Sequence, residues 1–543
     1  MIKYLYIKNF RSIKELELFP ENLCSLLGPN SVGKTNVLKA LDLLLGESWA
    51  TKGKISRELF NDPNEPIEIE ATFSTPIKYS DNYGREIVAE GVQLRMTLRP
   101  ELTCKVSTTP DGKFLSEDFK KKCHFIYIPS QRELSDQMRV TGWTLLGKLM
   151  KEVHANYIAA YGGDEEKLKA ELKEIIKPAK EFIEKDFDPS ATTFSKFVET
   201  FKRNCVQNSV GLANKFEPEL NIYNLNWFYK TLQIQVTEKN GQVFDAEDLG
   251  SGLQNLILIS IFQTYAELMG GRVIFGIEEP EIYLYPQAQR ALYESFQELS
   301  KNGQIFYTTH NPNFVSAFRA HEIEILQKDD EKGTYVLDKN SVITKDFLQD
   351  TQYKIYSHFN THRNEIFFAK KTLLVEGPSD KILWETLCKE KWGIDLNRSG
   401  ISIIDCSGKG GVIYFTGVCK LLGLNYFSVW DGDDEAPHEL LAEAQTSGRG
   451  LEIEGNLEKF LKSNYADLIF SKDEAKKIQQ AHEWAEKTTE WPAAFEPVKI
   501  FLSDPVPVVS ETPVVPAQPV EPDPLDDIFG GGEDDINPDD IPF

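Results

Sequence analysis

The chain has 543 residues, of which 41% are hydrophobic, and a formal net charge of −24. This length predicts two to four domains. No apolar run reaches the roughly 18 residues that a membrane span needs, and the seven cysteines form no CxxC pair. These features argue against a membrane protein, a disulfide scaffold and structural zinc. Met1–Lys8 lacks the features of a signal peptide, so we expect a cytoplasmic location.

The first informative segment is a phosphate-binding loop. Leu23–Leu27 has the pattern of a short buried strand, the loop Gly28–Thr35 follows, and apolar residues then recur at helical spacing. The loop glycines let backbone N–H groups turn toward phosphates, Lys34 supplies positive charge, and the Thr35 hydroxyl ligates Mg²⁺. The predicted nucleotide-binding residues of the loop are Asn30, Gly33, Lys34 and Thr35.

After a half-exposed strand at Ile67–Phe73, the character of the chain changes between residues 140 and 210. Lys and Glu are dense there, and apolar residues stand at helical intervals, which indicates helices inserted into the first domain. Two interpretations stay open: a solvated insertion or a dimerisation arm.

The nucleotide domain then resumes. Val273–Ile277 has the pattern of a buried strand that delivers Glu278 and Glu279 to a sheet edge, where the first binds Mg²⁺ through water and the second activates the attacking water. The strand Gln304–His310 ends on a histidine. We expect His310 to sense the γ-phosphate, with a structural core histidine as the alternative.

Residues 365–465 repeat strand and helix in alternation, which predicts a parallel sheet with flanking helices. Acidic residues follow its strands, at the edge where ligands usually bind. Hard oxygen ligands suit Mg²⁺ or Mn²⁺, and a two-metal site cleaves phosphodiesters. The alternative is that these carboxylates are ordinary turn and helix-start residues. The predicted metal ligands are Glu376, Asp431 and Asp433, with Glu458 as a further carboxylate, and Lys409 is placed near a phosphate. For Glu458 and Lys409 a solvated surface position is the rival.

From Pro505 onward the composition predicts an extended, disordered tail. Residues 501–543 hold eleven Asp or Glu and no Lys or Arg, which leaves the rest of the chain at −13, so any DNA contact needs a local basic groove. The block Pro524–Phe529 is repeated in similar form as Pro538–Phe543. The terminal Asp-Asp-Ile-Pro-Phe resembles the tip of bacterial single-stranded-DNA-binding proteins. This resemblance favours docking of genome-maintenance proteins, or competition with the host's own single-strand-binding protein, over a tail that only solvates.

The first domain resembles the ABC-type ATPases of the SMC and RecF-like class. The resemblance rests on the order of four motifs: the phosphate loop, Leu249–Gln254, Glu278–Glu281 and Thr309–Pro312. It implies that ATP is the nucleotide and that Ser251 and Gly252 contact ATP bound to the other subunit of a head-to-head dimer. The chain departs from the common pattern with Glu278 in place of Asp, and with Tyr283 and Tyr285 where His is frequent.

The Val375–Asp380 segment and Asp431-Gly432-Asp433 resemble a Toprim domain, and an ABC ATPase followed by Toprim resembles the OLD-family nucleases, which include the nuclease of the Gabija phage-defence system and some retron effectors. The resemblance spans about residues 1–465. It implies an ATPase and Mg²⁺- or Mn²⁺-dependent DNA endonuclease that acts in antiphage defence, with Glu376, Asp380, Asp431 and Asp433 as metal ligands. The family often carries a catalytic lysine in a longer Toprim C-terminal part, and no lysine here is assigned to that role.

The expected fold is therefore α/β. An ABC ATPase occupies residues 1–135 and 216–345, with a helical insertion at 136–215. A Toprim nuclease domain spans 365–500, and a disordered acidic tail spans 503–543. We expect a homodimer or larger homo-oligomer that acts on DNA. The alternative is a RecF- or SMC-like ATPase sensor or repair loader whose Toprim domain does not cut.

Overall fold

The structure is a computed structural model, and it describes residues 1–46, 48–130, 144–183, 194–208, 232–237, 241–268, 273–282, 284–337, 339, 361–432, 438–464 and 473–503. Asp433 and the acidic tail beyond Ser503 lie outside these residues, as do parts of the predicted insertion. Among the described helices, none is long and apolar enough to cross a bilayer.

The part that the sequence predicts to be the ATPase, which we call the ATPase part, is built on one large mixed sheet with the strand order β6-β5-β4-β1-β2-β13-β12-β3-β11-β10-β7. The neighbours β12, β3, β11, β10 and β7 run parallel, and the other pairings of the sheet are antiparallel. The strands are β1 (Ile2–Phe10), β2 (Ile13–Leu18), β3 (Leu23–Leu27), β4 (Ile67–Ser80), β5 (Glu86–Thr97), β6 (Thr103–Thr109), β7 (His124–Ile128), β10 (Val273–Glu278), β11 (Gln304–Thr308), β12 (Ile323–Asp329) and β13 (Gly333–Val336).

Helices cover this sheet on two faces, each with its own apolar core. On one face α1 packs with residues of β1, β4 and β5, and on the other α8 and α9 pack with residues of β10 and β11. The helices are α1 (Lys34–Leu45), α2 (Glu117–Lys122), α8 (Ser251–Leu268) and α9 (Pro286–Leu299), with short turns η1 (Lys52–Lys54), η2 (Arg57–Leu59), η3 (Ala246–Asp248), η4 (Pro312–Phe314) and η5 (Ala317–Glu322), and a hairpin of β8 (Gln235–Thr237) and β9 (Val243–Asp245).

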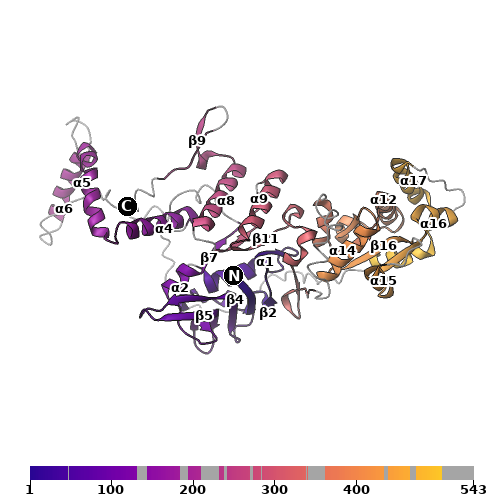
Figure 1. Ribbon diagram of the computed structural model, residues 1–543, viewed down its shortest axis with the longest axis horizontal. Helices are drawn as coiled ribbons and strands as arrows, with labels where there is room; N and C mark the ends of the chain where they lie inside the picture. The colour runs from indigo at the N-terminus through magenta and orange to yellow at the C-terminus, as the bar shows by residue number, and fades with distance from the viewer. Residues whose placement is uncertain are drawn as a thin grey trace.

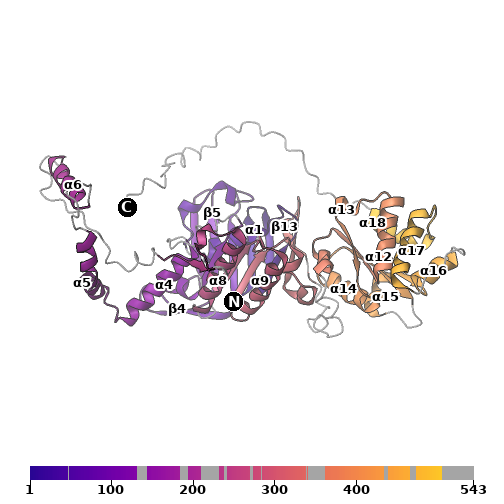
Figure 2. The ribbon, with the colours of Figure 1, turned by 90° about the horizontal axis from the view of Figure 1, so that it is seen from above.

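Within the predicted insertion the structure describes three helices, α4 (Leu145–Ala160), α5 (Glu165–Ile183) and α6 (Phe194–Asn208). They extend from the ATPase part on the side opposite to the C-terminal domain (Figures 1 and 2). We call α5 and α6 the arm.

The C-terminal domain contains a fully parallel sheet of order β15-β14-β16-β17, which confirms the expected parallel α/β unit. Its elements are η6 (Thr361–Phe367), β14 (Lys371–Val375), α12 (Pro378–Thr386), η7 (Leu387–Lys391), α13 (Leu396–Ser399), β15 (Ile401–Asp405), α14 (Lys409–Leu421), β16 (Tyr426–Gly432), α15 (Glu439–Thr446), β17 (Gly450–Glu454), α16 (Leu457–Asn464), α17 (Glu474–Lys487), η8 (Ala493–Phe495) and α18 (Glu496–Ser503).

A third apolar core joins the two parts. It unites Leu27, Val315 and Ile323 of the ATPase part with Ile366 and the buried face of α14 in the C-terminal domain. Apolar burial of this kind stabilises a fixed contact between domains. The two candidate sites are therefore built on parts that share one core.

Candidate functional sites

The phosphate loop has the local geometry that its sequence predicts. The fully buried strand β3 leads into it, and α1 begins at Lys34. Gly28 and Gly33 have positive φ angles of 142° and 107°, and a Cβ on Gly28 would lie 2.3 Å from the carbonyl oxygen of Leu326. Glycine is required there because any side chain would collide with backbone.

Lys34 is buried, and its Nζ donates to the carbonyl oxygens of Gly28 and Pro29 at 2.8 and 2.9 Å. Burial lowers the pKa of Lys34 to about 8, although Glu279 opposes the shift. Thr35 is half-buried in the first turn of α1, and Asn30 is exposed on the loop. The ammonium group therefore sits in a poorly hydrated place where an anionic phosphate would interact with it strongly.

Two residues that the sequence did not single out brace this loop. The Thr334 hydroxyl donates to the carbonyl oxygen of Val32 at 2.7 Å and lies 2.7 Å from the Ser12 hydroxyl. The Asn36 amide donates to that same Ser12 oxygen at 2.8 Å. These contacts join β13, the β1–β2 turn and α1, so they fix the loop from outside its own motif.

Arg11 precedes Ser12 in the same turn and adopts φ 53°, an unusual conformation for a residue other than glycine. Its Nε is buried without a hydrogen-bond partner in the structure. No sequence motif marks Arg11.

Glu278 ends the buried strand β10, as predicted, and protein donors engage both of its carboxylate oxygens. Its Oε1 accepts from the Tyr127 hydroxyl at 2.8 Å, and its Oε2 accepts from the backbone N–H of Ser130 at 3.0 Å. Glu279 follows with φ 42°, and its backbone N–H donates to the carbonyl oxygen of Thr308. The positive φ turns the chain at Glu279, whose charge acts on Lys34 of the phosphate loop.

His310 lies within electrostatic range of both Lys34 and Glu279. Its pKa is lowered, first because of burial and then because of the Lys34 charge, while Glu279 acts in the opposite sense. The imidazole is therefore held neutral at neutral pH. The structure thus brings three of the predicted residues together: the phosphate-loop lysine, the strand-end glutamate and the histidine.

Glu281 is a further member of this group that the sequence placed in a motif without a role. Its Oε1 accepts from the Thr309 hydroxyl at 2.5 Å and from the His310 backbone N–H at 3.2 Å, whereas its Oε2 is buried without a partner. Burial raises the pKa of Glu281. This carboxylate fixes the backbone that carries His310.

The predicted signature residues Ser251 and Gly252 begin helix α8. Ser251 is exposed and Gly252 is half-buried. Gln254 anchors the turn by donating to the carbonyl oxygens of Ala246 and Glu247 at 3.2 and 2.7 Å. The start of α8 is thus exposed, and Gln254 fixes the turn that precedes it. This arrangement fits the expectation that Ser251 and Gly252 contact ATP bound to the other subunit, which remains a prediction.

The second site lies at the carboxyl edge of the C-terminal sheet. Strands β14 and β16 are parallel neighbours, so Glu376 and Asp431 emerge side by side. Glu376 Oε1 accepts from the Asp431 backbone N–H at 2.9 Å, and Asp431 Oδ1 accepts from the N–H of Leu457 at 3.2 Å. Two strand ends and the start of α16 are thereby tied at one point.

Asp380, in the first turn of α12, completes an acidic group with Glu376, Asp431 and Glu458. Its pKa is raised to about 8 by burial, and then by the charges of Asp431, Glu376 and Glu458. Glu458 also pairs with Lys477 of α17 at 2.9 Å. Lys409 is half-buried at the start of α14.

These residues match a divalent-cation site in chemistry, since hard oxygen donors of one sign repel each other until a cation separates them. Among the described residues no three acidic, His or Cys side chains lie close enough to share an ion directly. Charges act on one another over longer distances than those between a metal ion and its ligands. The raised pKa of Asp380 therefore shows that these carboxylates are near one another, but it does not place them at ligand distances. Asp433, the fifth predicted ligand, lies outside the described residues.

The fold and the two sites define a class: an ATPase domain joined to a Toprim domain, which implies use of a nucleotide and a divalent metal. The family model for an AAA ATPase domain matches residues 1–109 and 101–315, and the model for the Toprim domain of overcoming-lysogenization-defect-like proteins matches residues 367–433. The chain therefore belongs to the AAA ATPase domain family, and its OLD-like Toprim domain gives it the OLD-family architecture.

The chain is similar to three named nucleases over most of their length. The chain is 28% identical to the OLD nuclease of Thermus scotoductus, over 84% of this chain and 87% of that protein. It is 23% identical to the Old nuclease of Escherichia phage P2, with coverage of 77% and 75%, and to the endonuclease GajA of Bacillus cereus, with coverage of 79% and 74%. A solved SMC head domain bound to the C-terminal winged helix of ScpA is 15% identical, with a TM-score of 0.36, over 62% of this chain and 96% of that one.

Proposed function

We propose that this protein is an ATP-regulated, Mg²⁺- or Mn²⁺-dependent DNA endonuclease that acts as a homodimer in antiphage defence. The observation that carries the proposal is the hydrogen bond between Glu376 and the backbone of Asp431, which sets two carboxylates at one sheet edge in a chain that also holds a phosphate loop. The named nuclease relatives, two of them called OLD or Old nuclease and one endonuclease GajA, support the same conclusion.

In the ATPase site, Lys34 binds the β- and γ-phosphates, and its depressed pKa makes the gain from an anionic partner large. The Thr35 hydroxyl would hold Mg²⁺ beside the phosphates, and the Glu278 carboxylate would hold it through water. Glu279 accepts a proton from the attacking water, and neutral His310 hydrogen-bonds the γ-phosphate. Ser251 and Gly252 of the second subunit complete the site.

In the Toprim site, Glu376, Asp380 and Asp431 are the residues that would hold one or two divalent ions, together with Asp433. When bound, such ions activate water and stabilise the leaving oxygen of a phosphodiester. Glu458, tied to Lys477, closes the site on the α16 side. Lys409 lies at a helix start on the same edge and would orient a backbone phosphate of DNA.

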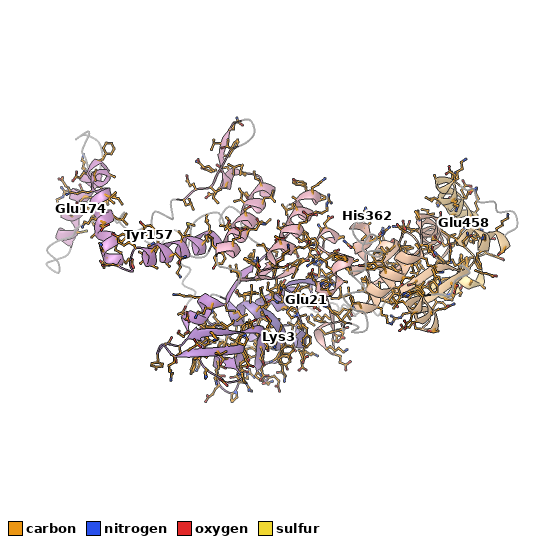
Figure 3. All side chains as sticks on the ribbon, viewed as in Figure 1. Lys3, Glu21, Tyr157, Glu174, His362 and Glu458 are labelled. Carbon is orange, nitrogen blue, oxygen red and sulfur yellow. The ribbon has the colours of Figure 1, made fainter. Side chains whose placement is uncertain are left out.

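The arm supports dimerisation. Both of its helices expose large apolar side chains: Ile175 is 73% exposed and Phe201 is 42% exposed. Figure 3 shows Glu174 on the arm and Glu458 at the far end of the molecule, so pairing through the arm would leave the Toprim site open to DNA. Apolar faces of this kind are buried when two helical hairpins associate.

We also propose that the acidic tail docks genome-maintenance proteins through its terminal Asp-Asp-Ile-Pro-Phe, by acidic steering to a basic rim and insertion of Phe543. A cytoplasmic location is proposed too, supported by seven cysteines that are all free thiols. Deletion of residues 539–543 tests the docking, because recovery of such partners on the full-length chain should fall; unchanged recovery would refute it.

The test of the main proposal is incubation of supercoiled plasmid with the full-length protein, with and without Mg²⁺ or Mn²⁺ and with and without ATP. Wild type should nick or linearise DNA only with metal, Asp431→Ala should not cleave, and Lys34→Ala should lose only the response to ATP. No cleavage by wild type under any condition would instead support the ATPase sensor or repair loader.

A further inference from the structure

A short turn that joins the two sites has no role in the proposed chemistry. It is η6, Thr361–Phe367, which precedes the first Toprim strand and carries two neighbouring buried polar residues, Arg363 and Asn364, at 8% and 5% exposure. Buried polar side chains of this kind are costly unless their hydrogen bonds are made. Asn364 bonds to the ATPase part, and Arg363 bonds to the Toprim part.

Asn364 reaches into the ATPase part. Its Nδ2 donates to the carbonyl oxygen of Pro312 at 2.9 Å and to that of Val315 at 2.8 Å. Pro312 stands two residues after His310, so this amide holds the segment that continues from the predicted γ-phosphate sensor.

That segment is stiff. Gln289 of α9 accepts from the side-chain amides of Asn311 and Asn313 at 2.8 and 3.0 Å, and the Tyr307 hydroxyl donates to the carbonyl oxygen of Phe314 at 2.6 Å. A displacement of His310 would therefore be passed to Pro312 rather than absorbed between them.

Arg363 reaches into the Toprim part. Its Nε donates to the carbonyl oxygen of Asp405 at 2.7 Å, and its Nη2 donates to the Ser407 hydroxyl. The next residue, Gly408, donates its N–H to the backbone carbonyl of Glu376 at 2.7 Å. Arg363 thus holds the loop that supports the predicted metal ligand.

We propose that Asn364 and Arg363 are positioning residues that couple the two sites, so that the position of His310 sets the position of Glu376. The inference rests on the proposed function, because it assumes ATP at the first site and DNA cleavage at the second. Figure 3 shows the neighbouring His362 between the ATPase and Toprim parts. The shared core of Val315, Ile366 and α14 holds η6 in a fixed position between the two parts. Coupling between sites of this kind typically changes affinity or rate about 5- to 150-fold.

The test compares nicking rates of the full-length protein in Mn²⁺ without nucleotide and with ATPγS, and takes their ratio as the nucleotide effect. We expect wild type to show at least about a 5-fold effect and Asn364→Ala to fall within about 2-fold of no effect. Nucleotide-free nicking and ATP hydrolysis should stay within about 3-fold of wild type, since neither site loses a reacting group. His362→Ala is the matched control: its side chain is 84% exposed on the same turn, and it should behave as wild type.

A second variant and a second readout cover a misfolded Asn364→Ala. Ser407→Ala removes one hydroxyl of the link and should reduce the nucleotide effect partway. Hydrogen exchange of residues 401–412 should change with ATPγS in wild type but not in Asn364→Ala. A wild-type ratio of one, or variants that keep the full nucleotide effect and the exchange change, would overturn the coupling. If wild type does not cleave DNA at all, the proposed function fails and the exchange experiment alone decides the link.

Discussion

The two sites balance charge in opposite ways. In the ATPase site a buried cation, Lys34, is flanked by carbonyl oxygens, Glu279 and a neutral histidine, so charges of both signs are present. In the Toprim site Asp380 faces three further carboxylates, and its pKa rises to about 8. The first arrangement is suited to an anion and the second to a divalent cation. The difference suggests that nucleotide and metal can be removed separately, each with its own signature.

The sharpest way to break this contrast is Asp431→Asn, which keeps the shape of the side chain and removes one charge. We expect at least a ~100-fold loss of DNA cleavage, because removing a direct ligand should cost more than the 10- to 100-fold typical of second-shell partners. The thermal stabilisation that Mn²⁺ gives to wild type should shrink as well. ATP hydrolysis should stay within about 2-fold. Full cleavage by this variant would remove Asp431 from the metal site.

Lys34→Ala is the reciprocal change. Loss of the charge that binds the phosphates should reduce ATP hydrolysis by about 10²- to 10³-fold, as for removal of a group that stabilises transition-state charge. Isothermal titration with ATPγS should show weaker binding, whereas nucleotide-free nicking and stabilisation by Mn²⁺ should match wild type. A parallel loss of Mn²⁺ stabilisation would contradict the separation of the two sites.

How far the sequence predicted each site follows from how the site is assembled. The eight residues of the phosphate loop are contiguous, so the sequence alone predicted their conformation. Glu376 and Asp431 were predictable because both stand at the ends of strands of a parallel sheet. The braces Ser12 and Thr334, and the link at Asn364, were not. They are common polar residues whose partners lie far away in the chain, and no local pattern distinguishes them from solvated ones. In the antiparallel part of the large sheet, alternation predicted the strand at Ile67–Phe73, which lies within β4, but it did not identify the strands that pair with it.

Glu281 offers a smaller effect with a defined pH dependence. Its pKa is raised in the folded protein, so its ionised form is disfavoured there, and the cost is present above the folded pKa and absent below the unfolded one. Glu281→Gln should therefore raise the melting temperature at pH 7.5, and the gain should vanish as the pH falls below about 4.5. ATP hydrolysis should change by less than about 3-fold, since the amide oxygen can still accept from Thr309 and His310. A loss above 100-fold would assign Glu281 a chemical role instead.

The smallest expected effect comes from the same substitution, Thr→Val, made once in each domain. The comparison separates a general loss of stability from a specific loss of ATP binding. Thr334 and Thr416 are both fully buried, and each hydroxyl lies 2.7 Å from a serine hydroxyl, Ser12 and Ser428 respectively. Thr334→Val and Thr416→Val should each cost about 1–2 kcal/mol of local stability, measured by hydrogen exchange, because a buried hydrogen bond is lost.

Of the two variants, only Thr334→Val should also weaken ATP binding, by a few-fold. The reason is that Thr334, unlike Thr416, donates to the Val32 carbonyl of the phosphate loop. Thr416→Val should leave ATP affinity unchanged. Equal ATP affinities in the two variants would mean that the loop keeps its shape without its brace. The geometry around Gly28 and Gly33 would then come from the loop's own sequence. The ATP site would not need the contact between Thr334 and Val32 to bind ATP.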